Sequence, residues 1–218
     1  MAEPLDHLLQ FLNESNALDD ASEKVDAGDH DHVSLLSDVL DMARRREPVA
    51  VADLVQWHSR ILREPEVASV PQSLREMLQR LNAELARLER LAPAADVARS
   101  LADHLYTFHA IHAFPRSNGR VGRLLAGYIA AWAGVPILVF RRAERDDLSK
   151  GIQDKLAMRC YVAAKLREAI FDRSGNLMRR TEAYGSADRY RGQDGASSVL
   201  MEWHDLLDAV DEWRRQGV

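Results

Sequence analysis

Hydrophobic side chains recur at intervals of three and four residues along most of the chain, which is the spacing of one face of an α-helix. No run that alternates hydrophobic and polar residues reaches the length of a β-strand. The sequence therefore predicts an all-α protein that folds as a compact helical bundle. Helices are expected at about residues 5–12, 33–46, 51–63, 74–92, 94–110, 119–132, 147–171 and 199–213.

Proline and glycine mark the ends of several of these helices. The ring of Pro48 disfavours helix in the residue before it, so the helix at 33–46 is expected to end there. Gly134, followed by Pro136, is expected to end the helix at 119–132. The apolar run 137–140 has no visible partner strand, and we expect a buried connector.

The pattern divides the chain into four parts. Residues 1–32 hold an N-terminal helix, residues 33–171 form the core, residues 172–198 form a linker rich in Gly, Ser, Arg and Asp, and residues 199–218 form a last helix. Trp203 and Trp213 lie on the apolar face of that helix. We expect it to dock on its own domain or on a partner, such as a second copy of the chain.

Composition narrows the partners and the compartment. The chain has 218 residues and a net charge of -5, whereas nucleic acids and anionic membranes usually bind a basic face, so neither is expected as a partner. No segment is long and apolar enough to cross a bilayer, and residues 1–6 lack the basic start of a signal peptide. The single cysteine, Cys160, is typical of a reducing compartment. A cytoplasmic protein is expected.

One segment differs from the acidic character of the whole chain. Residues 105–143 contain no Asp or Glu, although they hold five arginines: Arg116, Arg120, Arg123, Arg141 and Arg142. At the centre, residues 112–123 read HAFPRSNGRVGR. The Asn118-Gly119 turn is expected to open a helix, and the first N–H groups of a helix lack helical partners and lie at the positive end of its dipole. This arrangement favours phosphate binding.

The side chains around this turn extend the same chemistry. Arg120 and Arg123 are three residues apart, so they share one helix face and can hold phosphates by charge-assisted hydrogen bonds. His112 ends the preceding helix, and imidazole is the side chain best suited to take a proton from a hydroxyl near neutral pH. Phe114 is expected to be a buried anchor of the loop. Together these residues indicate a site for a phosphorylated donor beside a base.

The segment resembles the Fic family signature, which reads His-Pro-Phe-X-Asp/Glu-Gly-Asn-Gly-Arg-X-X-Arg. A second segment, Ser15–Asp20, resembles the inhibitory motif Ser/Thr-X-X-X-Glu-Gly/Asn that many Fic proteins carry near the N-terminus, with Asp19 in place of Glu and Asp20 in place of Gly or Asn. The likeness covers about residues 11–171 and implies a Fic-like helical fold. It also implies transfer of a nucleotidyl group, most often AMP from ATP, to a hydroxyl group. The residues that agree with the signature are His112, Phe114, Asn118, Gly119, Arg120 and Arg123.

The resemblance also implies roles for individual residues. His112 is the expected catalytic residue, and Ser15 and Asp19 are the expected regulatory residues, with Asp19 reaching Arg123. The alternative is that Ser15–Asp20 is only a helix end with polar caps. The expected binding residues for the phosphates of a nucleotide donor such as ATP are Arg116, Ser117, Asn118, Gly119, Arg120 and Arg123.

Three positions of the motif depart from the family, and Ala113 in place of proline is the mildest of these changes. Arg116 stands where the family has the acid that binds Mg²⁺, and a guanidinium cannot ligate a cation. Three alternatives follow. Arg116 replaces the positive charge of the metal, a carboxylate from elsewhere in the fold binds the metal, or the protein has lost catalysis. Ser117 replaces a glycine and either narrows the phosphate site or caps the helix. Residues 63–71 are too short for the β-hairpin flap that usually holds a Fic target, so the acceptor is a protein or a small molecule.

Three classes of function follow from these observations. We favour a divergent Fic-type transferase that acts on a hydroxyl of a protein or small molecule. A catalytically impaired module that binds nucleotides or other anions is the main alternative. A metal-dependent hydrolase that uses His104, His109 and His112 is disfavoured, since His104 and His109 are five residues apart on a helix and point in different directions.

Overall fold

The computed structural model describes residues 5–19, 30–63, 69–88 and 92–173, and their regular structure is entirely helical. This confirms the all-α prediction. The last helix and nearly all of the linker expected after residue 171 lie outside the described residues. In chain order the helices are α1 (Leu5–Leu18), α2 (His30–Arg44), α3 (Val51–Leu62), α4 (Gln72–Leu85), α5 (Ala94–Ile111), α6 (Asn118–Trp132), the short 3₁₀ helix η1 (Arg142–Glu144), α7 (Arg145–Gln153) and α8 (Lys155–Arg173).

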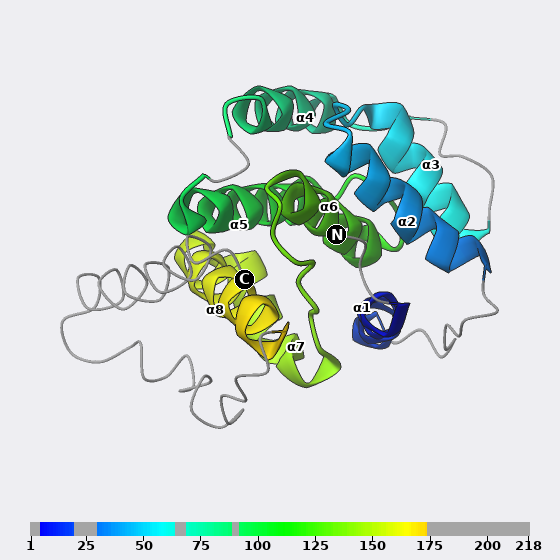
Figure 1. Cartoon of the computed structure of the whole chain (residues 1–218). Helices are drawn as coiled ribbons and strands as arrows, with labels where there is room; N and C mark the ends of the chain where they lie inside the picture. The colour runs from blue at the N-terminus through cyan, green and yellow to red at the C-terminus, as the bar shows by residue number, and fades with distance from the viewer. Residues whose placement is uncertain (1–4, 20–29, 64–68, 89–91, 174–218) are drawn as a thin grey trace.

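Helices α5 and α6 pack against each other in the middle of the molecule (Figure 1). Helices α7 and α8 pack on α5, whereas α2 and α3 pack on α6. Helix α4 also contacts α5, and α1 packs against both α2 and α6. The segment between α5 and α6 carries the HAFPRSNGRVGR motif, so the two most central helices position it from both ends.

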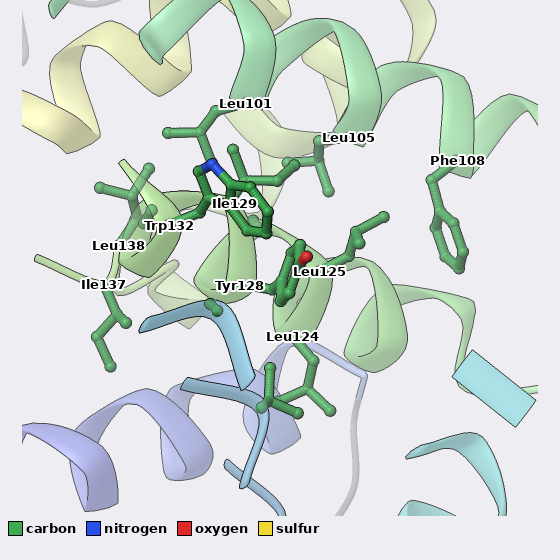
Figure 2. Packing of buried hydrophobic residues seen from close by; sticks show 14 of the residues in the cluster. Leu101, Leu105, Phe108, Leu124, Leu125, Tyr128, Ile129, Trp132, Ile137 and Leu138 are labelled. Atoms are coloured by element: carbon green, nitrogen blue, oxygen red, sulfur yellow. The ribbon is translucent and has the colours of Figure 1, made fainter. Parts of the chain in front are cut away.

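The part of the core seen in Figure 2 lies between α5, α6 and the connector that follows α6, and the same cluster extends to α1, α2, α3, α4 and α8. The apolar stripe predicted for α5 is buried throughout, and burial of each large side chain of this kind contributes about 1.5–3 kcal/mol. The polar groups of two aromatic residues on α6 find partners at the edge of the core. The Tyr128 hydroxyl donates to the Glu47 carbonyl at 2.6 Å, and the Trp132 indole donates to the Leu85 carbonyl at 2.9 Å. Helix α6 is therefore fixed by packing and by hydrogen bonds. The stripe of α5 consists of Val97, Leu101, Leu105 and Phe108.

The end of α6 has the predicted form. Gly134 takes a φ of 72°, a left-handed conformation that glycine adopts without strain, and its N–H donates to the Ala131 carbonyl at 3.1 Å. Residues 137–140 are buried and belong to no strand in the described part of the chain. This confirms the buried connector.

The prediction of a single helix at residues 147–171 is wrong, because the structure has two helices in this region, α7 and α8. Asp154 is extended, with φ −134° and ψ 119°. Its carboxylate accepts the N–H groups of Leu156 at 2.7 Å and Ala157 at 3.0 Å, which caps the start of α8. A Cβ at Gly151 would lie 3.1 Å from the Met158 Cα, so α7 and α8 meet too closely there for a larger residue.

Helix boundaries also differ from the pattern. Helix α1 continues to Leu18, which is buried in the core, and α2 begins at His30 inside the segment where a break was expected. Helix α4 ends at Leu85, earlier than predicted, although Leu88 remains buried beyond it. Residues 172 and 173, assigned to the linker, belong to α8.

None of the described helices combines the length and the apolar character that crossing a membrane requires.

Candidate functional site

The motif begins where α5 ends. His112 has a left-handed conformation, with φ 49° and ψ 53°, and its N–H donates to the Phe108 carbonyl at 3.3 Å, which closes the helix. This turn leaves the His112 side chain exposed. It lines a shallow groove of about 660 Å³ together with Ala113, Phe114, Pro115 and residues 69–71, which precede α4. The imidazole is therefore accessible to a molecule that lies in the groove.

Asn118 holds the motif loop closed from within. Its side-chain oxygen accepts the Phe114 N–H at 3.0 Å, and its amide nitrogen donates to the Phe114 carbonyl. Both residues are buried, so the two bonds are protected from competition with water. The Asn118 side chain is therefore occupied by the loop itself, and this residue shapes the loop through its bonds to Phe114.

Ser117 forms the turn that opens α6. It has a left-handed conformation, with φ 60° and ψ 20°, at the position where the Fic signature has glycine. The hydroxyl makes no cap bond to the α6 backbone, so the expectation that it caps the helix is wrong. Because the left-handed turn directs it elsewhere, it instead accepts a hydrogen bond from Arg120 Nη2 at 2.6 Å. Ser117 therefore orients one of the two motif arginines.

Arg123 is the second motif arginine, and it is only 2 % exposed. Its guanidinium donates to the Ser15 hydroxyl, to the Ser15 carbonyl and to Asp19 Oδ1, at 2.8 Å in each case. Burial lowers the pKa of Arg123, and the Asp19 carboxylate acts in the opposite direction, so Asp19 offsets part of the cost of burying the charge. The shorter aspartate makes the ion pair expected of a family glutamate, because α1 packs directly against α6.

The Asp19 carboxylate also lies at the N-terminus of α6. A Cβ added to Gly119 would come within 2.6 Å of Asp19 Oδ1 and 2.8 Å of Arg123 Nη1. Arg120 Nε lies 3.6 Å from Asp19 Oδ2. An anion therefore already sits where the helix dipole and two guanidinium groups favour negative charge. Glycine at position 119 is what allows it to come so close.

Comparison with known families agrees with this geometry. Residues 35–130, which include the whole motif, match the model of the Fic/DOC family. Residues 35–130 are therefore identified as a Fic domain. No curated protein matches the chain. Family membership and the all-helical fold support the resemblance that the motif alone indicated.

Two further histidines, His58 and His109, lie close to the motif of this Fic domain. Sequence analysis did not assign His58 to the site, and it considered His109 only as a metal ligand. His58 on α3 is buried, stacks on Phe114 with a ring-centroid distance of 4.5 Å, and lies 3.1 Å from the Arg116 carbonyl through Nε2. No periodic signal identifies it, since it lies beside Trp57 on a helix with an ordinary apolar face.

His109 lies in the last turn of α5, three residues before His112. Burial, together with the charges of Arg123 and His112, lowers its pKa to about 4, although Asp19 acts in the opposite direction. Its Nε2 is buried without a hydrogen-bond partner among the described residues. His109 is therefore neutral near pH 7 and does not add a charge to the site.

The three histidines considered as metal ligands do not form a metal site. His104 is buried and its Nδ1 lies 2.9 Å from the Ser100 carbonyl, while His112 faces the groove. Within residues 5–19, 30–63, 69–88 and 92–173, no group of three or more His, Cys, Asp or Glu side chains could hold a metal ion. This counts against the hydrolase alternative.

The Fic domain does not fit the magnesium ion that the family implies. Arg116, at the position of the metal-binding acid, is exposed and cannot ligate a cation. Within the described part of the chain, the Asp19 carboxylate approaches the motif, and it is paired with Arg123.

The structure thus brings several predicted residues together. Ser15, Asp19, Gly119, Arg120 and Arg123 form one cluster at the start of α6, which we call the anion site. Ser117 joins it through Arg120, whereas His112 lies at the other end of the loop and faces the groove. Asp20 and residues 64–68, which include most of the segment expected to replace the flap, lie outside the described residues.

Proposed function

We propose that this Fic domain transfers a nucleotidyl, AMP-like or related phosphate-linked group from a nucleotide donor to a hydroxyl group of a protein or a small molecule. The observation that carries the proposal is the position of the Asp19 carboxylate against Gly119 and Arg123. It supports an anion site at the N-terminus of α6, in the same motif as an exposed histidine. ATP is the donor suggested by the family resemblance.

The proposed reaction uses His112 as the base. Its imidazole takes the proton from the acceptor hydroxyl, whose oxygen then forms a bond to the phosphorus of the transferred group. The bond from that phosphorus to the leaving phosphate oxygen breaks, and the leaving group keeps the electron pair. Arg120, Arg123 and the first N–H groups of α6 stabilise the charge that develops on it. His112 then releases its proton to solvent.

The donor and Asp19 compete for the anion site in this proposal. A phosphate cannot lie against Gly119 while the Asp19 carboxylate is there, because a single added carbon would already be 2.6 Å from Oδ1. Ser15 contributes two of the three bonds that hold Arg123 in this arrangement. Ser15 and Asp19 are therefore proposed as regulatory residues, and donor binding requires α1 to shift or Asp19 to rotate.

The groove beside His112 is the proposed place of the acceptor. It is open and is lined by residues 69–71 and 112–115, with one hydroxyl at Ser69 and apolar surface at Val70, Pro71 and Phe114. A hydroxyl-bearing side chain or small molecule that lies there can reach the imidazole.

One observation favours a second candidate, a nucleotide- or anion-binding module without turnover. The guanidinium at position 116 replaces a carboxylate on which the chemistry of the family depends. A binding module needs the anion site but has no use for a proton acceptor. The two candidates therefore differ in what His112 contributes.

The deciding experiment is a search for product. Asp19→Ala protein is incubated with ATP, other nucleotides and nucleotide-linked metabolites, with Mg²⁺ or with EDTA, and candidate acceptors are analysed by intact-mass spectrometry. We expect a mass increase that is lost in His112→Ala and in Arg123→Ala and that EDTA lowers by less than about threefold. Arg80→Ala, an exposed arginine on α4 outside the motif, is the control and should be unchanged.

The outcomes separate the candidates. A transferase with His112→Ala keeps donor affinity, measured by calorimetry, and loses product. Binding without product for any donor and acceptor contradicts the transferase and supports the binding module. Strict dependence of product on Mg²⁺ would show that the site obtains metal ligands that Arg116 does not supply.

A further inference from the structure

His58 is bound to the motif loop from a different part of the chain. It lies on α3 and is only 4 % exposed. Its ring is nearly parallel to that of Phe114, with an angle of 12° between the planes. Because a carbonyl can only accept, the contact between Nε2 and the Arg116 carbonyl at 3.1 Å places a proton on Nε2, and His58 is the donor.

This hydrogen bond determines how one peptide group is turned. The peptide between Arg116 and Ser117 is trans and planar, so its C=O and N–H point in opposite directions. With the carbonyl held against His58, the N–H of Ser117 points away from α3. If the carbonyl were released and the peptide rotated, an oxygen would face the space that the N–H now faces.

The turn at Ser117 explains why that orientation matters. A left-handed residue followed by a right-handed helical residue turns successive N–H groups toward one side, and such concave arrangements bind anions. Ser117 is left-handed and Asn118 begins α6. The Ser117 N–H therefore precedes the first N–H groups of α6, and the Asp19 carboxylate lies close to this helix start, beside Gly119.

We propose that His58 is a positioning residue of the anion site: by holding the Arg116 carbonyl against α3, it presents the Ser117 N–H to a bound phosphate. The stack on Phe114 keeps the imidazole in place. Asn118 closes the same loop from the other side through Phe114. The inference rests on the proposed function only in taking the bound anion to be a donor phosphate.

The test separates the hydrogen bond from the packing of the ring. Two variants are made in Asp19→Ala protein, so that no carboxylate occupies the anion site. His58→Phe keeps the stack on Phe114 and loses the donor, whereas His58→Gln restores a donor. Binding of ATP and of inorganic pyrophosphate, both in EDTA, is measured by calorimetry, and the Ser117 amide is followed by ¹H–¹⁵N NMR.

We expect His58→Phe to weaken binding of both anions about tenfold, and His58→Gln to recover most of that loss. In the Asp19→Ala protein the Ser117 amide proton should move downfield on binding, and this shift should be absent in His58→Phe. A structural role alone would change the melting temperature and leave this shift intact. If His58→Phe does not fold, His58→Leu is compared with His58→Gln instead, since both variants lack the ring and only His58→Gln keeps a donor.

Two results would overturn the inference: equal affinity and an equal Ser117 shift in His58→Phe, or no binding of either anion by the Asp19→Ala protein. Failure of the proposed function would give a different result: no transfer product forms, while the effect of the His58 variants on anion binding remains. Conversely, product formation with unchanged KM and kcat in His58→Phe removes the role of His58 and leaves the transferase intact.

Discussion

Replacing Asp19 by alanine should destabilise the free protein and at the same time strengthen anion binding. The change removes one of the three bonds to the buried Arg123 guanidinium and leaves its charge without a counterion. Breaking a buried ion pair costs about 3–5 kcal/mol. The Asp19 side chain is 23 % exposed and Ser15 keeps its two bonds, so we expect a loss of about 2 kcal/mol.

The loss of stability predicts a change in the melting temperature and a change in the Kd for ATP. One kcal/mol shifts the Tm of a chain of this size by about 2–4 °C, so the variant should melt about 4–8 °C below the parent. ATP at a hundred times its Kd contributes about 2.7 kcal/mol and should restore the variant fully. If the parent must give up about 2 kcal/mol to displace Asp19, its Kd should be roughly 30-fold weaker.

The assay is thermal unfolding followed by circular dichroism in phosphate-free buffer, with and without ATP, combined with calorimetry. Asp19→Asn is the matched control, since it keeps the size and one acceptor oxygen but removes the charge. We expect it to fall between the parent and Asp19→Ala. Equal melting temperatures in the absence of ATP, or an equal ATP-induced shift in parent and variant, would refute the competition between Asp19 and a bound anion.

Two further predictions concern neighbours of the same site. The pKa of His109 is lowered to about 4 in the folded protein, so the unfolded chain binds a proton first as the pH falls, and stability should decline from about pH 6.5 to pH 4. His109→Leu should remove about 2–3 kcal/mol of that decline, measured by urea unfolding at pH 7 and pH 4; an unchanged slope would show that His109 is not buried as a neutral group. Gly119→Ala should lower the melting temperature and ATP affinity, although alanine favours helix, because its Cβ would collide with Asp19 and Arg123. A more stable Gly119→Ala protein with parental affinity would contradict the close approach.

Helix periodicity predicted most of the fold because the apolar stripes are local and their burial is collective. It failed at Asp154, where one carboxylate caps α8 and ends α7 within a stretch whose apolar spacing continues. Periodicity reports which face of a segment is apolar. It does not report a change of direction between two helices that both bury that face.

The residues of the motif are consecutive, so the sequence by itself determined that a helix starts at the Asn118-Gly119 turn. It also determined that arginines follow this turn and that a histidine precedes it. Only the tertiary structure decided what meets them. Arg123 and Asp19 are 104 residues apart, and His58 and Arg116 are 58 apart. These contacts exist because α1 and α3 pack against the central pair, and packing depends on the shape of the whole core, which local spacing does not encode.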